Sequence, residues 1–219
     1  KPQRRSWMVS AYTSAHASGA SDVKLLRSQT AFNAALVESN YTKNAVTFIG
    51  RNLKHRFPIS VGVNVKKRLT DRWGIETGLV YSYLESSGDL DAEYTYRYKQ
   101  KIHYLGIPLN LSYSLYQNKR LDIYLQGGGM AEMALSAHGY TRIFNHGVFA
   151  SDIDDKLPAS GVLWSVGLGA GISYDFVQNF GLYLEPGANY YFPNSNQPRS
   201  YRTDNPWSFN VRVGFRFKF

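Results

Sequence analysis

The chain contains no cysteine, which excludes disulfide bonds, thiol catalysis and cysteine-ligated metal sites. It also lacks any run of eighteen apolar residues, which excludes a transmembrane helix. No charged-then-apolar signal sequence follows Lys1, so we expect a processed product or a fragment of a longer protein. Clustered basic charge is missing as well. The formal net charge is +9, but the basic residues are scattered and nucleic-acid binding is not expected.

What the chain does have is alternation between apolar and polar residues, clearest at its C-terminal end. The apolar set there is Trp207, Phe209, Val211, Val213, Phe215, Phe217 and Phe219, and the polar set is Ser208, Asn210, Arg212, Gly214, Arg216 and Lys218. Successive side chains of a strand point to opposite faces, so this segment is predicted to be a strand with one aromatic and one basic face.

The same period of two predicts seven further strands. The eight predicted strands are Ser6–Thr13, Phe57–Arg68, Trp73–Leu84, Gln100–Leu115, Leu121–Leu135, Val162–Phe176, Leu182–Tyr191 and Trp207–Phe219. Composition does not change abruptly along the 219 residues, which favours one all-β domain. We therefore expect a barrel domain over residues 6–219, preceded by the end of a periplasmic linker over residues 1–5.

The predicted connections alternate in length. Short ones with turn residues are Leu69–Arg72, Tyr116–Arg120 and Val177–Gly181, and long ones are Ser14–Arg56, Glu85–Lys99, Ser136–Gly161 and Phe192–Pro206. With eight strands, the short turns fall at the same end as both termini. The sequence thus predicts an eight-stranded antiparallel up-and-down transmembrane β-barrel in the outer membrane, with short periplasmic turns, periplasmic termini and long extracellular loops.

A soluble barrel of the lipocalin kind is the main alternative, and it would place the apolar face inside. The polar face argues against it, because glycine, serine and isolated charges suit a narrow hydrated interior better than a solvated exterior. We expect the opposite face to contact lipid, with aromatic girdles at the interfaces. The predicted lipid-facing or girdle residues are Trp7, Trp73, Tyr81, Tyr83, Trp164, Tyr174, Trp207, Phe209, Phe215, Phe217 and Phe219.

Four segments together resemble the outer-membrane β-barrel domain common in Bacteroidota. They are Leu69–Tyr83, His103–Tyr113, Gly181–Tyr191 and Val211–Phe219. Within that group the chain is most similar to the C-terminal barrel of a double-membrane-spanning anti-sigma factor. The resemblance implies a cytoplasmic region that binds a sigma factor, an inner-membrane helix and a periplasmic linker, all upstream of Lys1. A sigma factor would be a partner only through that upstream region.

An eight-stranded barrel is only wide enough inside for side chains, so charges there must pair. The predicted inward charges are Lys66, Glu76, Glu132, Asp175, Glu185, Arg212, Arg216 and Lys218. We expect a network in which Glu76 and Glu185 meet Arg212 and Arg216, most simply as the structural core of the barrel. A catalytic role of Glu132 or Glu185 is the alternative interpretation.

Residues for catalysis or metal binding form no known pattern. The histidines His16, His55, His138 and His146 fall in or near predicted loops, without a recognisable spacing to a nucleophile, and His103 falls on a strand close to its loop end. Asp152, Asp154 and Asp155 lack the glycine and distal glutamate of a calcium loop. We expect no enzyme activity, no metal and no cofactor.

The first long connection carries a basic excess that includes Lys24, Arg27 and Lys54. These residues are candidates for contact with lipopolysaccharide phosphates; a simple cover over the barrel mouth is the alternative. Other expected partners are outer-membrane lipid and, through the C-terminal strand, the barrel-assembly machinery, and the barrel is expected to be monomeric. The predicted function is a membrane anchor or sensor domain of an anti-sigma regulator. A stand-alone structural or adhesion barrel and a small-ligand protein or channel remain open.

Overall fold

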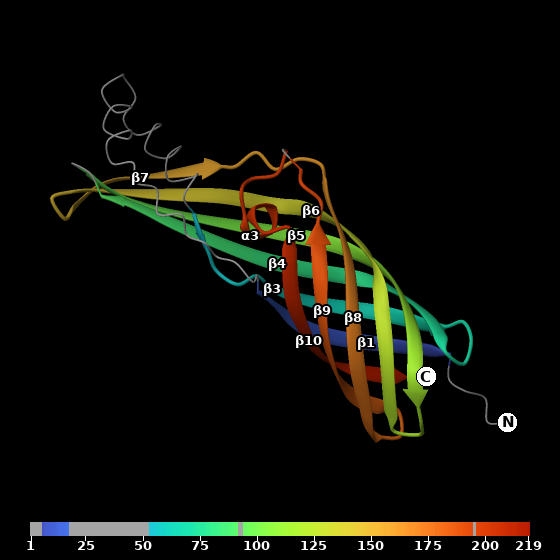
Figure 1. The fold of residues 1–219 in the computed structure, drawn as a ribbon. Helices are drawn as coiled ribbons and strands as arrows, with labels where there is room; N and C mark the ends of the chain where they lie inside the picture. The colour runs from blue at the N-terminus through green and yellow to red at the C-terminus, as the bar shows by residue number, and fades with distance from the viewer. Residues whose placement is uncertain (1–5, 18–52, 92–93, 195) are drawn as a thin grey trace.

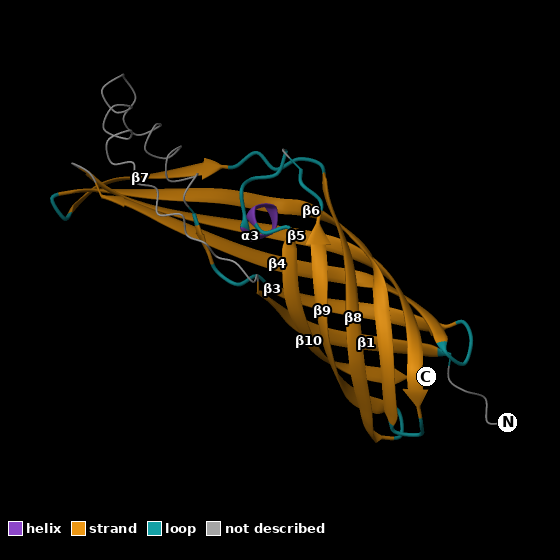
Figure 2. Ribbon diagram, viewed as in Figure 1, coloured by secondary structure: helices purple, strands orange, loops and turns teal. Residues whose placement is uncertain are grey.

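The computed structural model describes the chain except for residues 1–5, 18–52, 92–93 and 195. Its strands are β1 (Trp7–Ala17), β2 (Lys54–His55), β3 (Ile59–Arg68), β4 (Trp73–Asp91), β5 (Tyr94–Gln117), β6 (Leu121–Asn145), β7 (Val148–Lys156), β8 (Val162–Val177), β9 (Phe180–Tyr191) and β10 (Trp207–Lys218). A short helix, α3 (Tyr201–Asp204), lies between β9 and β10. Figures 1 and 2 show the strands wound into a tilted barrel.

The barrel is a closed ring of eight antiparallel strands in the order β1, β3, β4, β5, β6, β8, β9 and β10. It closes between β1 and β10, with Met8 opposite Lys218 and Ala17 opposite Phe209. Closure pairs every ring strand on both sides, so the barrel has no free edge. This confirms the predicted fold class.

The two ends of the barrel differ. Trp7 and Phe219 are joined by backbone hydrogen bonds of 3.4 and 3.0 Å, and the short turns that follow β3, β5 and β8 lie at this same end, at the lower right of Figure 1. We call it the turn end. The strands β1, β4, β6 and β9 run toward the opposite end, which we call the loop end.

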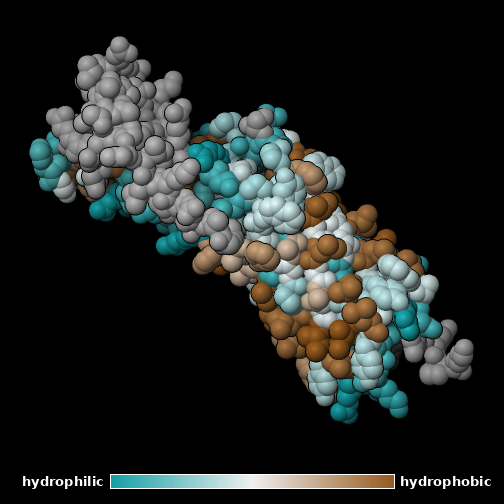
Figure 3. Space-filling view, in the orientation of Figure 1, coloured by the Kyte–Doolittle hydropathy of each residue, from teal (hydrophilic) through white to brown (hydrophobic). Residues whose placement is uncertain are grey.

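The faces of the strands decide between a membrane barrel and a soluble one. On β3, Ile59, Val61 and Val63 are 54%, 49% and 55% exposed, whereas Asn64 and Lys66 are only 1% and 4% exposed. The apolar set therefore points outward and the polar set into the lumen, the reverse of a lipocalin-type barrel. In Figure 3, hydrophobic residues form a band over the barrel wall, with hydrophilic residues at both ends.

Three strands continue well beyond the barrel wall. The strands β4, β5 and β6 have 19, 24 and 25 residues, compared with 10 in β3 and 12 in β10. Together with β7 they form a sheet extension, which we define as residues 85–91, 94–102, 136–145 and 148–156 and which projects to the upper left in Figure 1. The predictions of long loops at Glu85–Lys99 and Ser136–Gly161 are therefore wrong for most of their length.

A β-bulge explains one of these errors. In the pairing of β5 with β6, His103 is opposite Ser136 and Tyr104 is opposite Ala134, so Leu135 has no partner. One extra residue shifts the alternation by one position. Beyond it Ala137 is buried, whereas the even-numbered residues of β6 face the lumen before it. The strand continues, but its period-two pattern is interrupted at the point where the predicted strand ended.

The connection from β9 to β10 returns to the barrel mouth through α3. The helix is one turn long, and the backbone N–H of Ser200 donates to Thr203 Oγ1 at 2.7 Å at its start. Its Tyr201 and Arg202 are buried although they belong to a loop. Within the described part of the chain, no helix is long and apolar enough to cross a membrane.

Candidate functional site

The middle of the lumen holds a layer of charges and tyrosines. Arg212 Nη1 on β10 lies 2.8 Å from Glu185 Oε1 on the neighbouring strand β9. The other oxygen of Glu185 accepts a hydrogen bond of 2.9 Å from the Tyr124 hydroxyl, which in turn accepts one of 3.2 Å from Arg216. Arg216 thus reaches Glu185 through Tyr124 rather than directly, and its guanidinium also lies 4.6 Å from the centroid of the Tyr183 ring.

Glu76 is held in this layer by amide groups. Its Oε1 accepts hydrogen bonds from Asn64 Nδ2 at 2.8 Å and from Gln126 Nε2 at 3.2 Å. Lys66 is opposite Glu76 in the sheet register, and its ammonium group lies 4.7 Å from the centroid of the Tyr124 ring. The predicted set Lys66, Glu76, Glu185, Arg212 and Arg216 therefore points into the lumen and is linked largely through neutral side chains, which satisfy the buried carboxylates.

Glu132 belongs to a second layer, nearer the loop end, with a partner that the sequence analysis did not identify. Arg202 Nη1 on α3 lies 2.5 Å from Glu132 Oε2, and Ser82 donates to the other oxygen of Glu132 at 3.2 Å. The guanidinium of Arg202 also lies over the rings of Tyr104 and Tyr191. Tyr104 donates to Gln197 of the same β9–β10 connection at 2.9 Å. The connection therefore inserts a cation into the barrel mouth.

A third group of charges lies at the turn end. Lys218 on β10 pairs with Asp175 on β8, and Arg68 Nη2 lies 3.6 Å from Asp122 Oδ2. Both carboxylates are buried. The predicted inward charges of the barrel thus occur at three depths along the lumen.

Glycines make room for the lumenal tyrosines. A Cβ added to Gly171 would lie 2.2 Å from Cζ of Tyr124, and one added to Gly62 would lie 2.5 Å from Cζ of Tyr12. The two rings therefore lie directly over glycine backbone of a neighbouring strand.

Between the middle layer and the Arg202 layer there is a space of about 50 Å³, lined in part by Tyr12, His16 and Arg212, which is enough for only a few water molecules.

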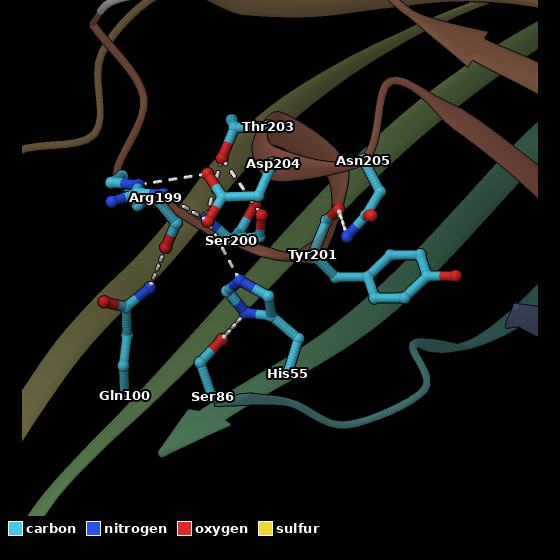
Figure 4. Close-up of polar contacts among 9 residues, drawn as sticks. All are labelled: His55, Ser86, Gln100, Arg199, Ser200, Tyr201, Thr203, Asp204 and Asn205. Atoms are coloured by element: carbon cyan, nitrogen blue, oxygen red, sulfur yellow. Dashed lines mark hydrogen bonds and ion pairs between the residues drawn. The ribbon is translucent and has the colours of Figure 1, made fainter. Parts of the chain in front are cut away.

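A polar latch fastens α3 to the sheet extension (Figure 4). We define it as His55, Ser86, Gln100, Arg199 and Asp204. His55 contacts Ser86 Oγ at 2.7 Å through Nδ1 and Asp204 Oδ2 at 3.1 Å through Nε2. Arg199 binds both oxygens of Asp204, at 3.0 and 2.8 Å, and Gln100 donates to the backbone carbonyl of Arg199 at 2.6 Å. These contacts join α3 to β2, β4 and β5.

The latch contains an acid whose ionised form is favoured. Burial raises the pKa of Asp204, but the hydrogen bonds from His55 and Arg199 and their positive charge outweigh burial and hold this pKa below its ordinary value. The carboxylate is therefore the natural state of Asp204 at neutral pH, as its bidentate contact with Arg199 requires.

The order Ser86, His55, Asp204 matches the chain of contacts in a serine-hydrolase triad, and sequence spacing gave no sign of it. Two features argue against catalysis. Ser86 is 1% exposed, so a substrate has no access to its hydroxyl, and the carboxylate that would orient the histidine is already bound by Arg199 on both oxygens. The geometry suits a structural latch rather than nucleophilic attack.

The other predicted histidines and acids are dispersed. His16 is on β1 and His138 on β6, so neither lies in a loop, whereas His146 lies in the hairpin between β6 and β7. Asp152, Asp154 and Asp155 are on β7; the prediction that they form a loop is wrong. His103 contacts the Tyr81 hydroxyl at 2.5 Å on the outer face. No group of three or more metal-ligating side chains occurs among the described residues.

The predicted lipid-facing set lies on the outside of the ring. Trp7, Trp73, Tyr81, Trp164, Tyr174, Trp207, Phe209, Phe215, Phe217 and Phe219 are exposed, and Tyr83 is half-buried. Of the predicted surface-contact residues, Lys24 and Arg27 lie outside the described residues, and Lys54 is exposed on β2.

A closed ring of strands with an apolar exterior and a charged interior defines an integral barrel of the outer membrane. Comparison with protein families agrees. The model of the outer membrane protein beta-barrel domain matches residues 3–196, most of the chain, and the chain belongs to this family. Its location is therefore the outer membrane. No curated protein matches the sequence.

Solved structures of other outer-membrane proteins are similar in fold. Neisserial surface protein A is 14% identical with a TM-score of 0.45, and 97% of each chain is covered. OprG from Pseudomonas aeruginosa is 13% identical with a TM-score of 0.45, covering 99% of this chain and 97% of that one. Ail of Yersinia pestis is 9% identical with a TM-score of 0.44, covering 99% and 100%. At TM-scores below 0.5, none of them informs the function of this chain.

Proposed function

We propose that this chain is a closed, non-enzymatic anchor in the outer membrane that holds the sheet extension away from the bilayer. The observation that carries the proposal is the buried pair of Arg202 and Glu132 in the barrel mouth, 2.5 Å apart. The pair fills the lumen on the loop-end side of the middle layer, which contains Glu185, Arg212 and Tyr124. A lumen filled at two levels by bonded side chains suits anchoring rather than transport.

The sheet extension is the part of the anchor that is available for contact. Val148 and Phe149 are 71% and 57% exposed near its tip. Binding residues commonly lie on segments that a rigid scaffold holds in place. This favours a structural or adhesion role at the cell surface. Lipopolysaccharide contact through Lys24, Arg27 and Lys54, a monomeric state and assembly through the C-terminal strand remain parts of the proposal.

The orientation on which this role depends is also proposed: sheet extension outside the cell, turn end and termini in the periplasm. The absence of cysteine makes single-cysteine labelling a clean test. With a membrane-impermeant maleimide on intact cells, Asp152→Cys on β7 should be labelled. Lys119→Cys in the β5–β6 turn should be labelled only after the outer membrane is permeabilised. The opposite pattern would overturn the orientation and with it the surface role.

A second candidate is that the anchor is the C-terminal part of an envelope-spanning anti-sigma regulator. It is supported by the sequence resemblance of Leu69–Tyr83, His103–Tyr113, Gly181–Tyr191 and Val211–Phe219. The test is the mass of the native polypeptide in fractionated envelopes, detected with an antibody against the barrel. A product much larger than 24.8 kDa with a cytoplasmic N-terminal part is expected for the regulator. A product near that mass, confined to the outer membrane, contradicts it.

A further inference from the structure

An apolar groove crosses the outer face of the barrel close to the turn end. Its volume is about 580 Å³, within the range of roughly 300–1,000 Å³ that is usual for small-molecule sites. It crosses β4, β5, β6, β8 and β9, and its lining consists of Trp73, Leu111, Tyr113, Leu125, Gln126, Gly127, Leu168, Gly169, Ala170, Pro186 and Gly187.

The groove exists because small residues face outward between larger ones. Gly127 on β6 is opposite Leu111 on β5 and Leu168 on β8. Because glycine has no side chain, the outer surface is recessed between these two leucines. Ala170 lies opposite Leu125 in the next outward row. An acyl chain fills such a depression against leucine, alanine and glycine, in keeping with the depletion of charge on a lipid-facing wall.

The end of the groove nearest the turns carries a cation. Trp73 and Tyr113 line the groove there and pack together with ring centroids 4.8 Å apart. The exposed Arg72 donates from Nη1 to the Tyr113 hydroxyl at 3.0 Å and lies 6.0 Å from the centroid of its ring. This contact orients the guanidinium beside the groove and uses one of its five N–H donors.

The depth of this cation matches a lipid headgroup. Trp73 is the first residue of β4, directly after the turn that contains Arg72, and exposed tryptophan at a strand end marks the interface between hydrocarbon and headgroups. A guanidinium at that level meets phosphate oxygens, which it binds through two parallel hydrogen bonds. The apolar groove and the cation are therefore arranged in the same order as the acyl chain and phosphate of a phospholipid.

We infer that this groove is a binding site for one anionic phospholipid of the membrane leaflet at the turn end. An acyl chain lies along Gly127, Leu125 and Ala170, and the phosphate group contacts Arg72. The apolar groove sets the affinity for the acyl chain, and Arg72 sets the preference for a lipid that carries a phosphate group.

The test is native mass spectrometry of the barrel in detergent, titrated with phosphatidylglycerol or with diacylglycerol of the same acyl chains. Wild-type protein should retain phosphatidylglycerol in preference. Arg72→Ala should lower its affinity about tenfold, the loss expected for a charge-assisted contact, and leave the affinity for diacylglycerol, which has no phosphate, nearly unchanged. Lys119→Ala removes another exposed cation of the turn end and is the matched control, with no effect expected.

A substitution that fills the groove tests the acyl-chain contact separately from the Arg72 contact. A Cβ added to Gly127 would lie 2.6 Å from Cδ2 of Leu168, the movable end of an exposed side chain, so Gly127→Leu should fold and give the heat-dependent shift in gel mobility of a folded barrel. It should weaken both lipids equally. Equal retention of the two lipids by the wild type, or the same loss in Lys119→Ala as in Arg72→Ala, would overturn the assignment.

Discussion

The guanidinium of Arg202, on the short helix α3, lies 2.5 Å from the carboxylate of Glu132 on β6, a residue 70 positions earlier in the chain. Both side chains are buried, with 1% and 0% of their surface exposed. A loop of the barrel mouth is thereby tied to the barrel wall by an ion pair that water does not screen. The contact holds the β9–β10 connection in the barrel mouth.

Breaking the pair should destabilise the barrel strongly. Arg202→Ala leaves the Glu132 carboxylate buried without its partner, which costs about 3–5 kcal/mol, whereas a double replacement, Arg202→Met with Glu132→Met, should recover most of that loss. The free energy of unfolding in urea, measured in detergent micelles, checks this. Lys119→Ala, at an exposed turn, is the control. A double variant whose loss equals the sum of the two single losses would contradict the pairing.

The lipid-facing wall should reject charge. Leu168 is 76% exposed near the middle of β8, so Leu168→Arg should reduce the free energy of folding into phospholipid vesicles by about 2–4 kcal/mol. Leu168→Met preserves the apolar surface and should change it by less than about 1.5 kcal/mol. If arginine were tolerated as well as methionine, Leu168 would not face the hydrocarbon.

The middle layer of the lumen, around Tyr124, should have no room for a larger side chain at Gly171. In Gly171→Leu the new side chain meets the Tyr124 ring and displaces the hydroxyl that joins Glu185 and Arg216. We expect a loss of about 1–3 kcal/mol in the free energy of unfolding, the usual cost of overpacking. Adding Tyr124→Ala should make Gly171→Leu harmless relative to Tyr124→Ala alone. A full loss in both backgrounds would show that the ring does not cover Gly171.

Acid should loosen the α3 latch. Because contacts with His55 and Arg199 hold the pKa of Asp204 below its ordinary value, the latch is stabilised above the ordinary pKa near 4. That stabilisation is lost as pH falls through the depressed pKa of the folded state. Amide NMR signals of residues 199–205 in micelles should therefore shift or broaden as pH falls below about 4. In Asp204→Asn they should already be perturbed at neutral pH. An acid transition retained in Asp204→Asn would assign it to another group.

The barrel itself could be predicted from the sequence because its signal is local. Each wall strand alternates on its own, as Trp207–Phe219 does, and alternation on opposite faces is a property of neighbouring residues. The sheet extension was missed because its local pattern differs from that of the barrel wall. In β6 the alternation restarts on the other parity after the unpaired Leu135. The outward side of the extension, with Lys99, Lys101 and Arg142, is polar like a loop.

The site was predictable only where register alone determines contacts. Arg212 and Glu185 are opposite each other on neighbouring strands, so a paired register brings them together. The partner of Glu132 comes from a loop 70 residues away. The alternation of residues along a strand cannot predict which part of the barrel a loop will contact. The latch contacts among His55, Ser86 and Asp204 join three separate elements, β2, β4 and α3, and are likewise visible only in the folded chain.

The most direct test of the closed-anchor account is single-channel recording of the refolded protein in planar bilayers, with a known porin as the positive control. The account predicts no steady conductance for the wild type. It predicts none for Arg202→Ala either, because the layer of Tyr124, Glu185 and Arg212 still fills the lumen. Reproducible, long-lived conductance steps from the wild-type barrel would contradict it.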